Sequence, residues 1–323
     1  MPQSHSGSRR PNLLVVTILG LSAGMLYVCF DPLPAGESPP TTGNSEQTAF
    51  PIVPLPPNAD SIPAGEGAAG DESGDGASAI KCGLTNRETL KFCLLMLKDG
   101  IRLLNSVDTY TATFHKQERI GGDLSEVQAI DLKVRHFPKF AVYMNWRNGD
   151  RGRQLLYNKQ YEDGDMVVKL GGLKGRLLPG IKLNPHGSMA TSESRYPVTN
   201  AGILGMLKQI VAHREHDLVH DHAVSCQRLR NQPFDGHDCY CFLFVYNDPD
   251  ISTTYRKSII LIDAVRHIPL MARNYTWATD CDDMPAEELD ELTLIEGYSF
   301  TAIDFAEEVL AIEFSRDNPR YRM

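Results

Sequence analysis

The sequence "RHFPKFAVYMNW", residues 135–146, indicates the fold more strongly than any other stretch of this chain. Every second residue from Phe140 to Trp146 carries a large side chain that is mainly apolar. A period of two is typical of a β-strand that presents one apolar face. The stretch therefore predicts a strand whose apolar face belongs either to a packed core or to the wall of a site for an apolar ligand.

The same alternation recurs before and after this stretch. Ala112 and Phe114 alternate with polar neighbours, and so do Ile130, Leu132 and Val134. Turn sequences such as "NGDRG", "PFDG" and "NDPD" separate the later segments. The order predicts a long antiparallel meander, with further strands near residues 154–158, 166–170, 224–229, 240–246, 256–262, 268–277 and 292–305.

Helical periodicity occurs at two places outside the strands. Thr85 and Glu88 form a capping-box pattern, and apolar residues then recur at helical spacing up to Asn105. A second helix is predicted over residues 199–216, after a glycine-rich loop at residues 171–197. An acidic insert, "DCDDMPAEELDE", separates the last strands. Helices beside an antiparallel sheet place the folded part, residues 82–323, in the α+β class.

The N-terminal region has the pattern of a membrane-targeting segment. Arg9 and Arg10 precede an uncharged apolar run at residues 13–30, which as a helix would span about 27 Å, close to the thickness of the bilayer hydrocarbon. The positive-inside rule then leaves residues 1–12 in the cytoplasm and makes residues 13–30 a transmembrane signal anchor in the inner membrane. Cleavage as a signal peptide, with secretion to the periplasm, is the alternative.

Residues 31–80 have the composition of a disordered linker. They hold nine of the chain's 20 prolines, seven glycines and no Lys or Arg. Such a segment buries too little apolar surface to fold. We expect it to tether a domain that faces the periplasm or the exterior.

The net charge and the histidine residues bear on two possible partners, nucleic acid and zinc. The net charge of −9 does not favour nucleic acid, whose binding requires clustered Lys and Arg. The stretch "HREHDLVHDH" contains His213, His216, His220 and His222, which could serve zinc. Because no Cys or Glu lies at motif distance, a solvated helix end is the preferred interpretation, with no metal and no cofactor.

Two cysteines could form a disulfide outside the cytoplasm. The turn "PFDG" would fold Cys226 back toward Cys241 or Leu243. A bridge between Cys226 and Cys241 is one interpretation, and reduced core cysteines are the other.

The glycine-rich loop and the scattered acids give two further expectations. Lys174 and Arg176 lie among glycines and could contact anionic headgroups as part of a lid, or the loop could simply be mobile. Glu118, Asp131, Asp263 and Asp304 are interpreted as turn or solvent-face acids. No catalytic group is predicted, and a hydrolase or a metal-binding protein is a minor alternative.

The order of elements resembles the periplasmic lipoprotein-carrier (LolA-like) fold. The resemblance rests on the first helix, on "YTATFHKQ" and "FPKFAVYMNW", and on the later stretches "KSIILIDAVRHIPLMARNYTW" and "YSFTAIDFAEEVLAIEFS". The shorter stretches "YPVTNAGI", "FDGHDCYCF" and "YRKSI" are similar to an uncharacterised bacterial domain family. The carriers are soluble shuttles, so the predicted anchor departs from their pattern.

The resemblance implies an incomplete, half-open β-barrel capped by helices, whose concave apolar face holds acyl chains. Arg135 would correspond to the arginine that fastens the lid of a carrier. The expected function is non-enzymatic binding of a hydrophobic or lipid-modified ligand in the cell envelope. The alternative is a structural or sensor module that binds an envelope protein. The residues that would line the concave face are Phe114, Leu132, Val134, Phe140, Val142, Met144 and Trp146.

Overall fold

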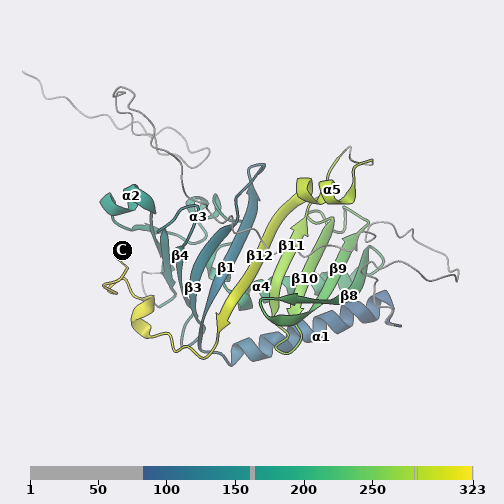
Figure 1. Cartoon of the computed structure of the whole chain (residues 1–323), viewed down its shortest axis with the longest axis horizontal. Helices are drawn as coiled ribbons and strands as arrows, with labels where there is room; N and C mark the ends of the chain where they lie inside the picture. Colours follow the sequence, from purple (N-terminus) through teal and green to yellow (C-terminus); the bar gives the residue numbers. More distant parts are fainter. Residues whose placement is uncertain (1–82, 161–163, 280, 282, 322) are drawn as a thin grey trace, which may run out of the picture. The chain divides into compact units, whose positions relative to one another are not determined.

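The computed structural model describes residues 83–323, apart from positions 161–163, 280, 282 and 322 (Figure 1). The predicted N-terminus, anchor and linker, residues 1–80, lie outside the described residues. Within the described part, none of the helices has the length and apolar character needed to cross a membrane. The anchor stays a prediction.

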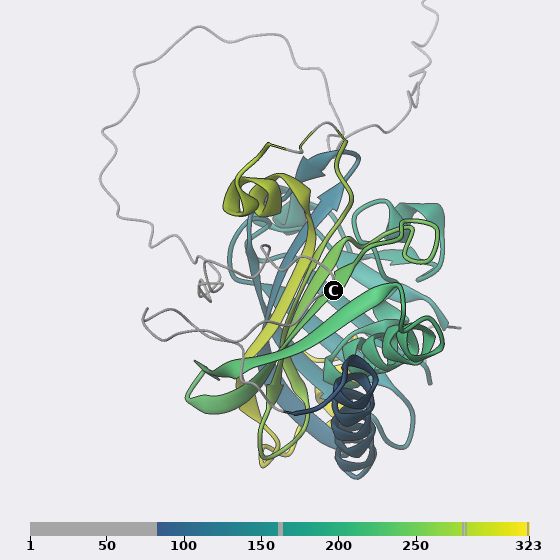
Figure 2. The same cartoon turned by 90° about the vertical axis from the view of Figure 1, so that its right-hand side faces the viewer.

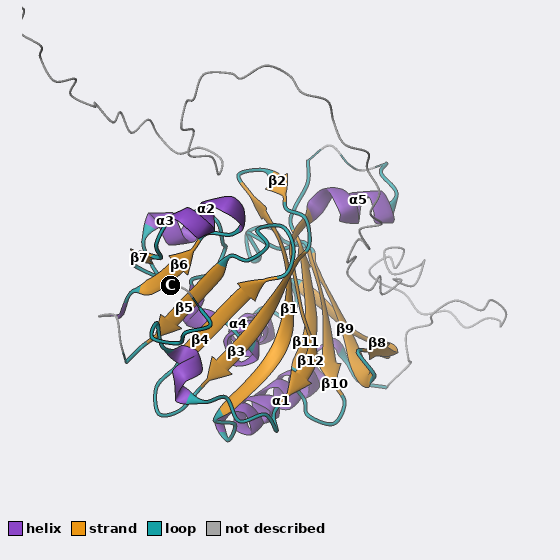
Figure 3. Cartoon of the chain, turned by 60° about the vertical axis from the view of Figure 1, so that its left-hand side comes forward, coloured by secondary structure: helices purple, strands orange, loops and turns teal. Residues whose placement is uncertain are grey.

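An open antiparallel sheet forms the body of the domain (Figures 1 and 3). The strands follow the order β7-β6-β5-β4-β3-β1-β12-β11-β10-β9-β8, and the short β2 pairs with β1. The pairing of β1 with β12 joins two meanders from the two halves of the chain. The bounds are β1 (Thr109–Ile120), β2 (Asp123–Leu124), β3 (Gln128–Arg135), β4 (Ala141–Trp146), β5 (Gln154–Asn158), β6 (Met166–Lys169), β7 (Ile181–Leu183), β8 (Val224–Phe234), β9 (His237–Tyr246), β10 (Lys257–Asp263), β11 (Pro269–Tyr275) and β12 (Leu294–Asp304). The predicted antiparallel meander and the α+β class are confirmed.

The first helix, α1 (Asn86–Asn105), begins at the predicted capping box. The backbone N–H of Glu88 donates to Thr85 Oγ1 at 3.3 Å, and the backbone N–H of Thr85 donates to Glu88 Oε2 at 2.8 Å. These bonds satisfy donors that have no partner within the helix.

The second long helix, α4 (Ile203–Val219), begins four residues later than predicted, because the backbone conformation of Gly202 fixes its start. Gly202 has a φ of +85°, and a Cβ there would lie 2.6 Å from the hydroxyl oxygen of Tyr110. That hydroxyl accepts the backbone N–H of Ile203 at 2.8 Å. Only glycine allows this approach, so the position sets where α4 meets the sheet.

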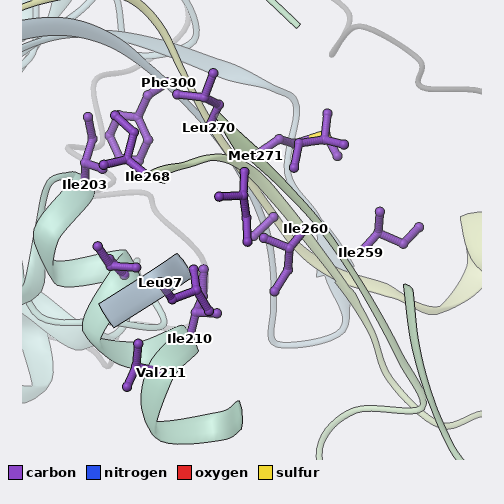
Figure 4. Packing of buried hydrophobic residues seen from close by; sticks show 14 of the residues in the cluster. Leu97, Ile203, Ile210, Val211, Ile259, Ile260, Ile268, Leu270, Met271 and Phe300 are labelled. Carbon is purple, nitrogen blue, oxygen red and sulfur yellow. The ribbon is translucent and has the colours of Figure 1, made fainter. Parts of the chain in front are cut away.

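Both long helices cover the inner face of the sheet (Figure 2). Lys98 of α1 and Glu215 of α4 form an ion pair at 2.7 Å. Beneath them, Leu97 and Ile210 face Ile260 of the sheet (Figure 4). The helices therefore fill the concavity over β8–β11 with their own side chains.

The glycine-rich loop and the acidic insert contain elements that the sequence pattern missed. The loop includes α2 (Gly172–Leu177), β7 and α3 (Ser188–Thr191), and η2 (Val198–Asn200) follows it. The insert ends in α5 (Ala286–Thr293), so the last strand begins at Leu294. Pro285 precedes α5, and Glu287 and Glu288 lie in its first turn, where negative charge suits the helix dipole.

The outer face of the sheet is covered by two chain segments. The tip of the β8–β9 hairpin crosses this face, where Asp235 Oδ2 accepts the backbone N–H of Ala302 of β12 at 2.7 Å (Figures 1 and 2). The C-terminal segment with η3 (Ala311–Phe314) packs Phe314 and Tyr321 against Tyr143 and other side chains of β4 and β5.

Candidate ligand-binding face

All seven residues predicted to line a concave face lie on the inner face of the sheet. Across β3 and β4, Leu132 stands opposite Met144 and Val134 opposite Val142. They belong to one buried cluster, together with side chains of α1 and α4. The apolar wall, as this set is named, consists of Phe114, Leu132, Val134, Phe140, Val142, Met144 and Trp146.

One end of the apolar wall is packed without accessible surface. Val134 and Val142 are 0% exposed and Leu132 is 1% exposed. They lie beside the start of α4, because a Cβ at Gly202 would be 3.3 Å from the Val134 side chain. This end is a packed core.

The other end of the apolar wall is also largely buried, and only its Phe114 is half-buried. Met144 and Leu155 form a register pair, and each is 7% exposed. Trp146 keeps 6%, and Phe114 is half-buried. Under α1 and α4, by contrast, Phe242 and Phe244 of β9 are both 0% exposed. Residues of the long helices keep as much surface, since Ile210 and Val211 of α4 are both 8% exposed, so the two regions of the inner face are closely packed to a similar degree.

A short irregular segment, residues 184–202, contributes to covering this end. This cover segment contains α3 and η2, and its Ala190 and Ala201 pack against the core cluster. Arg153, which directly precedes β5, pairs with Glu193 of the cover segment at 2.7 Å, and its guanidinium carbon lies 5.1 Å from the Trp146 ring centre. The contact ties the cover segment to the apolar wall.

A polar network fastens the end of the cover segment. Arg195 Nε donates to Glu296 Oε2 of β12 at 2.6 Å, and the Arg195 backbone N–H donates to Glu118 Oε2 of β1 at 3.2 Å. Lys116 Nζ donates to Ser194 Oγ at 3.0 Å and lies 3.0 Å from the Glu118 carboxylate. The cover segment is therefore held by charged groups on two neighbouring strands.

The two carboxylates of this network are register partners. Glu118 and Glu296 stand opposite each other across β1 and β12, and they are 2% and 1% exposed. Two buried like charges would repel each other strongly, so the cations Lys116 and Arg195 are needed beside them. The two carboxylates and the two cations together carry no net charge.

Tyrosine hydroxyls complete the shell around the carboxylates. Tyr255 OH and Tyr196 OH donate to Glu296 Oε1 at 2.8 and 3.2 Å, and Tyr298 OH donates to Glu118. Burial, followed by the charge of Glu296, raises the pKa of Tyr196 to about 12, and the same causes raise the pKa of Tyr298. The hydroxyls remain protonated donors at neutral pH. These donors point at the carboxylates, so the arrangement stabilises a closed cover rather than presenting a free acid or base.

The expectation that Glu118 faces solvent is wrong. Its side chain is in phase with Phe114 and Lys116 on the inner face of β1. On β12, Glu296 is likewise in phase with Tyr298 and Phe300. A period-two count through the charged positions would have placed both carboxylates on the apolar side.

Arg135 does not join the apolar wall. It lies on the outer face, with its guanidinium carbon 5.1 Å from the centre of the Phe314 ring and Nη2 donating to Asn158 Oδ1 at 3.2 Å. The alternation of β3 explains this, because Arg135 follows the inward-facing Val134. Arg135 therefore lies away from the cover segment, whose own Arg195 bonds to Glu296 and Glu118.

Lys174 and Arg176, the other two predicted lid residues, belong to α2 rather than to the cover segment. Their backbone lies at the β6–β7 end of the sheet (Figure 3). Their side chains are outside what the structure describes.

The predicted disulfide between Cys226 and Cys241 is not formed, and both residues are free thiols. Cys226 stands opposite Phe244, on the inner face, whereas Cys241 stands opposite Leu229 and is three residues from Phe244. The two side chains therefore point to opposite faces of the sheet, which prevents a bridge. Burial raises the pKa of Cys241 to about 12.

The histidine stretch lies near the end of α4, as predicted. The rings of His216 and His220 are 4.6 Å apart, and His213 packs edge-on against Tyr255 at 5.3 Å. Among the described residues, no group of three or more His, Cys, Asp or Glu side chains is arranged to hold a metal ion.

The remaining acids differ in their surroundings. Asp304 accepts the backbone N–H of Ala306 at 2.7 Å, which confirms a turn role. Asp263 accepts turn N–H groups as expected, but it is only 1% exposed. Asp131 pairs with Arg147 on the outer face of β3 and is partly exposed.

Residues 107–323 match the family described as protein of unknown function (DUF1571). The chain belongs to this family. The predicted membership of an uncharacterised domain family is confirmed. No curated protein matches the chain.

Several solved structures are similar to this chain at low sequence identity. A LolA superfamily protein from Nitrosomonas europaea shares 11% identity over 70% of this chain and 98% of its own, with a TM-score of 0.27. The lipoprotein LppX from Mycobacterium tuberculosis shares 12% identity over 68% of this chain and 98% of its own, with a TM-score of 0.38. A DUF1329 family protein from Desulfovibrio piger shares 12% over 71% of this chain and 98% of its own, with a TM-score of 0.33.

Proposed function

We propose that the domain binds an apolar or acylated ligand non-covalently against the inner face of β4 and β5, beneath the cover segment. The observation that carries this proposal is the continuous apolar wall on one face of the sheet, in which Phe114 and Phe140 are only half-buried. Met144, Trp146 and Leu155 extend the same apolar face and are 6–7% exposed. A ligand would reach this apolar face once the cover segment moves aside.

The chemistry of this place suits an amphiphile. The apolar wall would contact a chain, while the nearby Lys116 and Arg153 would lie beside a polar or anionic head. Because the cover segment is irregular and is fastened by side-chain contacts, it can move without unfolding a long helix. Opening would require the contacts of Arg195 with Glu296 and Glu118 to break.

A position outside the cytoplasm is part of the proposal. Arg9 and Arg10 before the apolar run at residues 13–30 support an anchor with the domain on the far side of the inner membrane. A reporter enzyme that works only in the cytoplasm, fused after Met323, should be inactive in cells. An active fusion would contradict this topology.

The ligand site is tested by filling it. Met144→Trp places a bulky side chain on the inner face of β4, and Asn145→Trp places the same side chain on the outer face as a matched control. The protein is purified from residue Ser78 onward, bound lipid is measured by mass spectrometry, and melting temperatures are compared. We expect Met144→Trp to lose lipid with little change in melting temperature, and Asn145→Trp to retain lipid.

Two outcomes would contradict the ligand site. If Met144 fills a close-packed core, Met144→Trp overpacks it and costs about 1–3 kcal/mol of stability. If the unmodified domain also carries no lipid and binds no fluorescent fatty acid, the alternative of a module that binds a protein partner becomes the better account.

A further inference from the structure

Exposed apolar side chains gather at the β7 edge of the sheet. Leu173 and Leu177 lie four residues apart on α2, so they share one helix face, and they are 75% and 84% exposed. Leu178 and Ile181 follow directly and are also exposed. The α2–β7 surface, as this group is named, protrudes at one end of the domain (Figure 3).

The stretch of sequence that carries this surface is basic, in a chain that is otherwise acidic. Residues 166–192 contain Lys169, Lys174, Arg176 and Lys182 and no Asp or Glu, whereas the whole chain carries a net charge of −9. Exposed leucines among basic residues are the pattern of a segment that lies on an anionic membrane surface.

We propose that the α2–β7 surface docks on the headgroup region of an anionic lipid bilayer. Leu173 and Leu177 enter the boundary between headgroups and acyl chains, and the basic residues of the same stretch add attraction to the lipid phosphates. A second copy of this chain fits the surface less well, because a symmetric contact would bring the same basic residues together. The local positive charge thus favours an anionic bilayer as the partner.

Docking through the α2–β7 surface would place the proposed ligand site close to the bilayer. Met189 of α3, which is 58% exposed, belongs to the cover segment and follows β7 closely in the chain. Docking through α2 would bring the cover segment near the bilayer, from which an apolar ligand could be taken or to which it could be delivered. The docking proposal does not depend on ligand binding, since a domain that binds bilayers and holds no lipid would retain it.

The test reads the depth of single tryptophans in the full chain. Leu177→Trp reports from the proposed surface, and Val265→Trp is the matched control because Val265 is 87% exposed in the turn between β10 and β11. Each variant is mixed with vesicles of phosphatidylcholine, with or without phosphatidylglycerol, that carry brominated acyl chains. The signal of the unmodified chain, with Trp146 and Trp277, is subtracted.

We expect bromine quenching and a blue shift for Leu177→Trp when phosphatidylglycerol is present, and neither for Val265→Trp. Adding K174E and R176E should reduce binding through this surface by more than tenfold, since each basic residue near an anionic surface contributes roughly fivefold. Equal quenching of the two tryptophans, or none at Leu177→Trp, would overturn the proposal. A concentration-dependent blue shift without vesicles would overturn it in favour of a contact between copies.

Discussion

Replacing Arg195 with Met should loosen the cover segment at a measurable cost in stability. Arg195 is the cation bonded to Glu296, whose carboxylate is almost fully buried, while the Arg195 side chain itself is 23% exposed. Breaking a fully buried ion pair costs about 3–5 kcal/mol. Tyr255 and Asn274 still donate to Glu296 in the variant, at 2.8 and 2.7 Å, and the arginine is partly solvated. We therefore expect a loss of about 2–3 kcal/mol in the free energy of unfolding.

Urea unfolding, followed by circular dichroism, measures this loss. The double variant Arg195→Met/Glu296→Gln should be more stable than Arg195→Met alone, because it leaves no unpaired buried charge. Arg87→Met is the matched control, since the pair of Arg87 with Asp221 is exposed and should contribute less than about 1 kcal/mol. If Arg195→Met costs no more than Arg87→Met, or if the double variant loses the sum of both single effects, the polar network does not fasten the cover segment.

Three further predictions concern pH, thiols and the domain boundary. Burial lowers the pKa of His115, His136 and His213 below 6.5, so the unfolded chain binds more protons just below that pH and the free energy of unfolding should fall as the pH drops through 6.5; a flat urea-midpoint profile there would contradict this. The partly exposed Cys281 should react with a thiol reagent in the folded protein, while the buried cysteines react only after denaturation, as mass spectrometry of labelled peptides can show. A fragment that begins at Ser78 should unfold cooperatively with the melting temperature of the longer soluble chain, and a non-cooperative transition would mean that residues before it are structural.

Strand periodicity predicted much of the fold because it reflects burial on one side of a sheet. Residues 135–146 and the alternating segments around them gave the antiparallel order, and the inner-face position of the apolar wall followed from it. The sequence pattern failed where a charged side chain occupies a buried position. Glu118 resembles a solvent-facing acid, although its position in β1 is in phase with Phe114.

Local pattern therefore determined the class of the fold, the face of each strand and the start of α1, since these depend on neighbours along the chain. Tertiary structure alone decided which distant residues meet. Glu296 reaches Glu118 only because β12 returns to pair with β1, and Arg195 reaches both only because the cover segment crosses that pair. A buried carboxylate is stable only where cations and hydroxyls from other segments surround it. The three-dimensional packing, and not the residue type, therefore placed Glu118 in the candidate site.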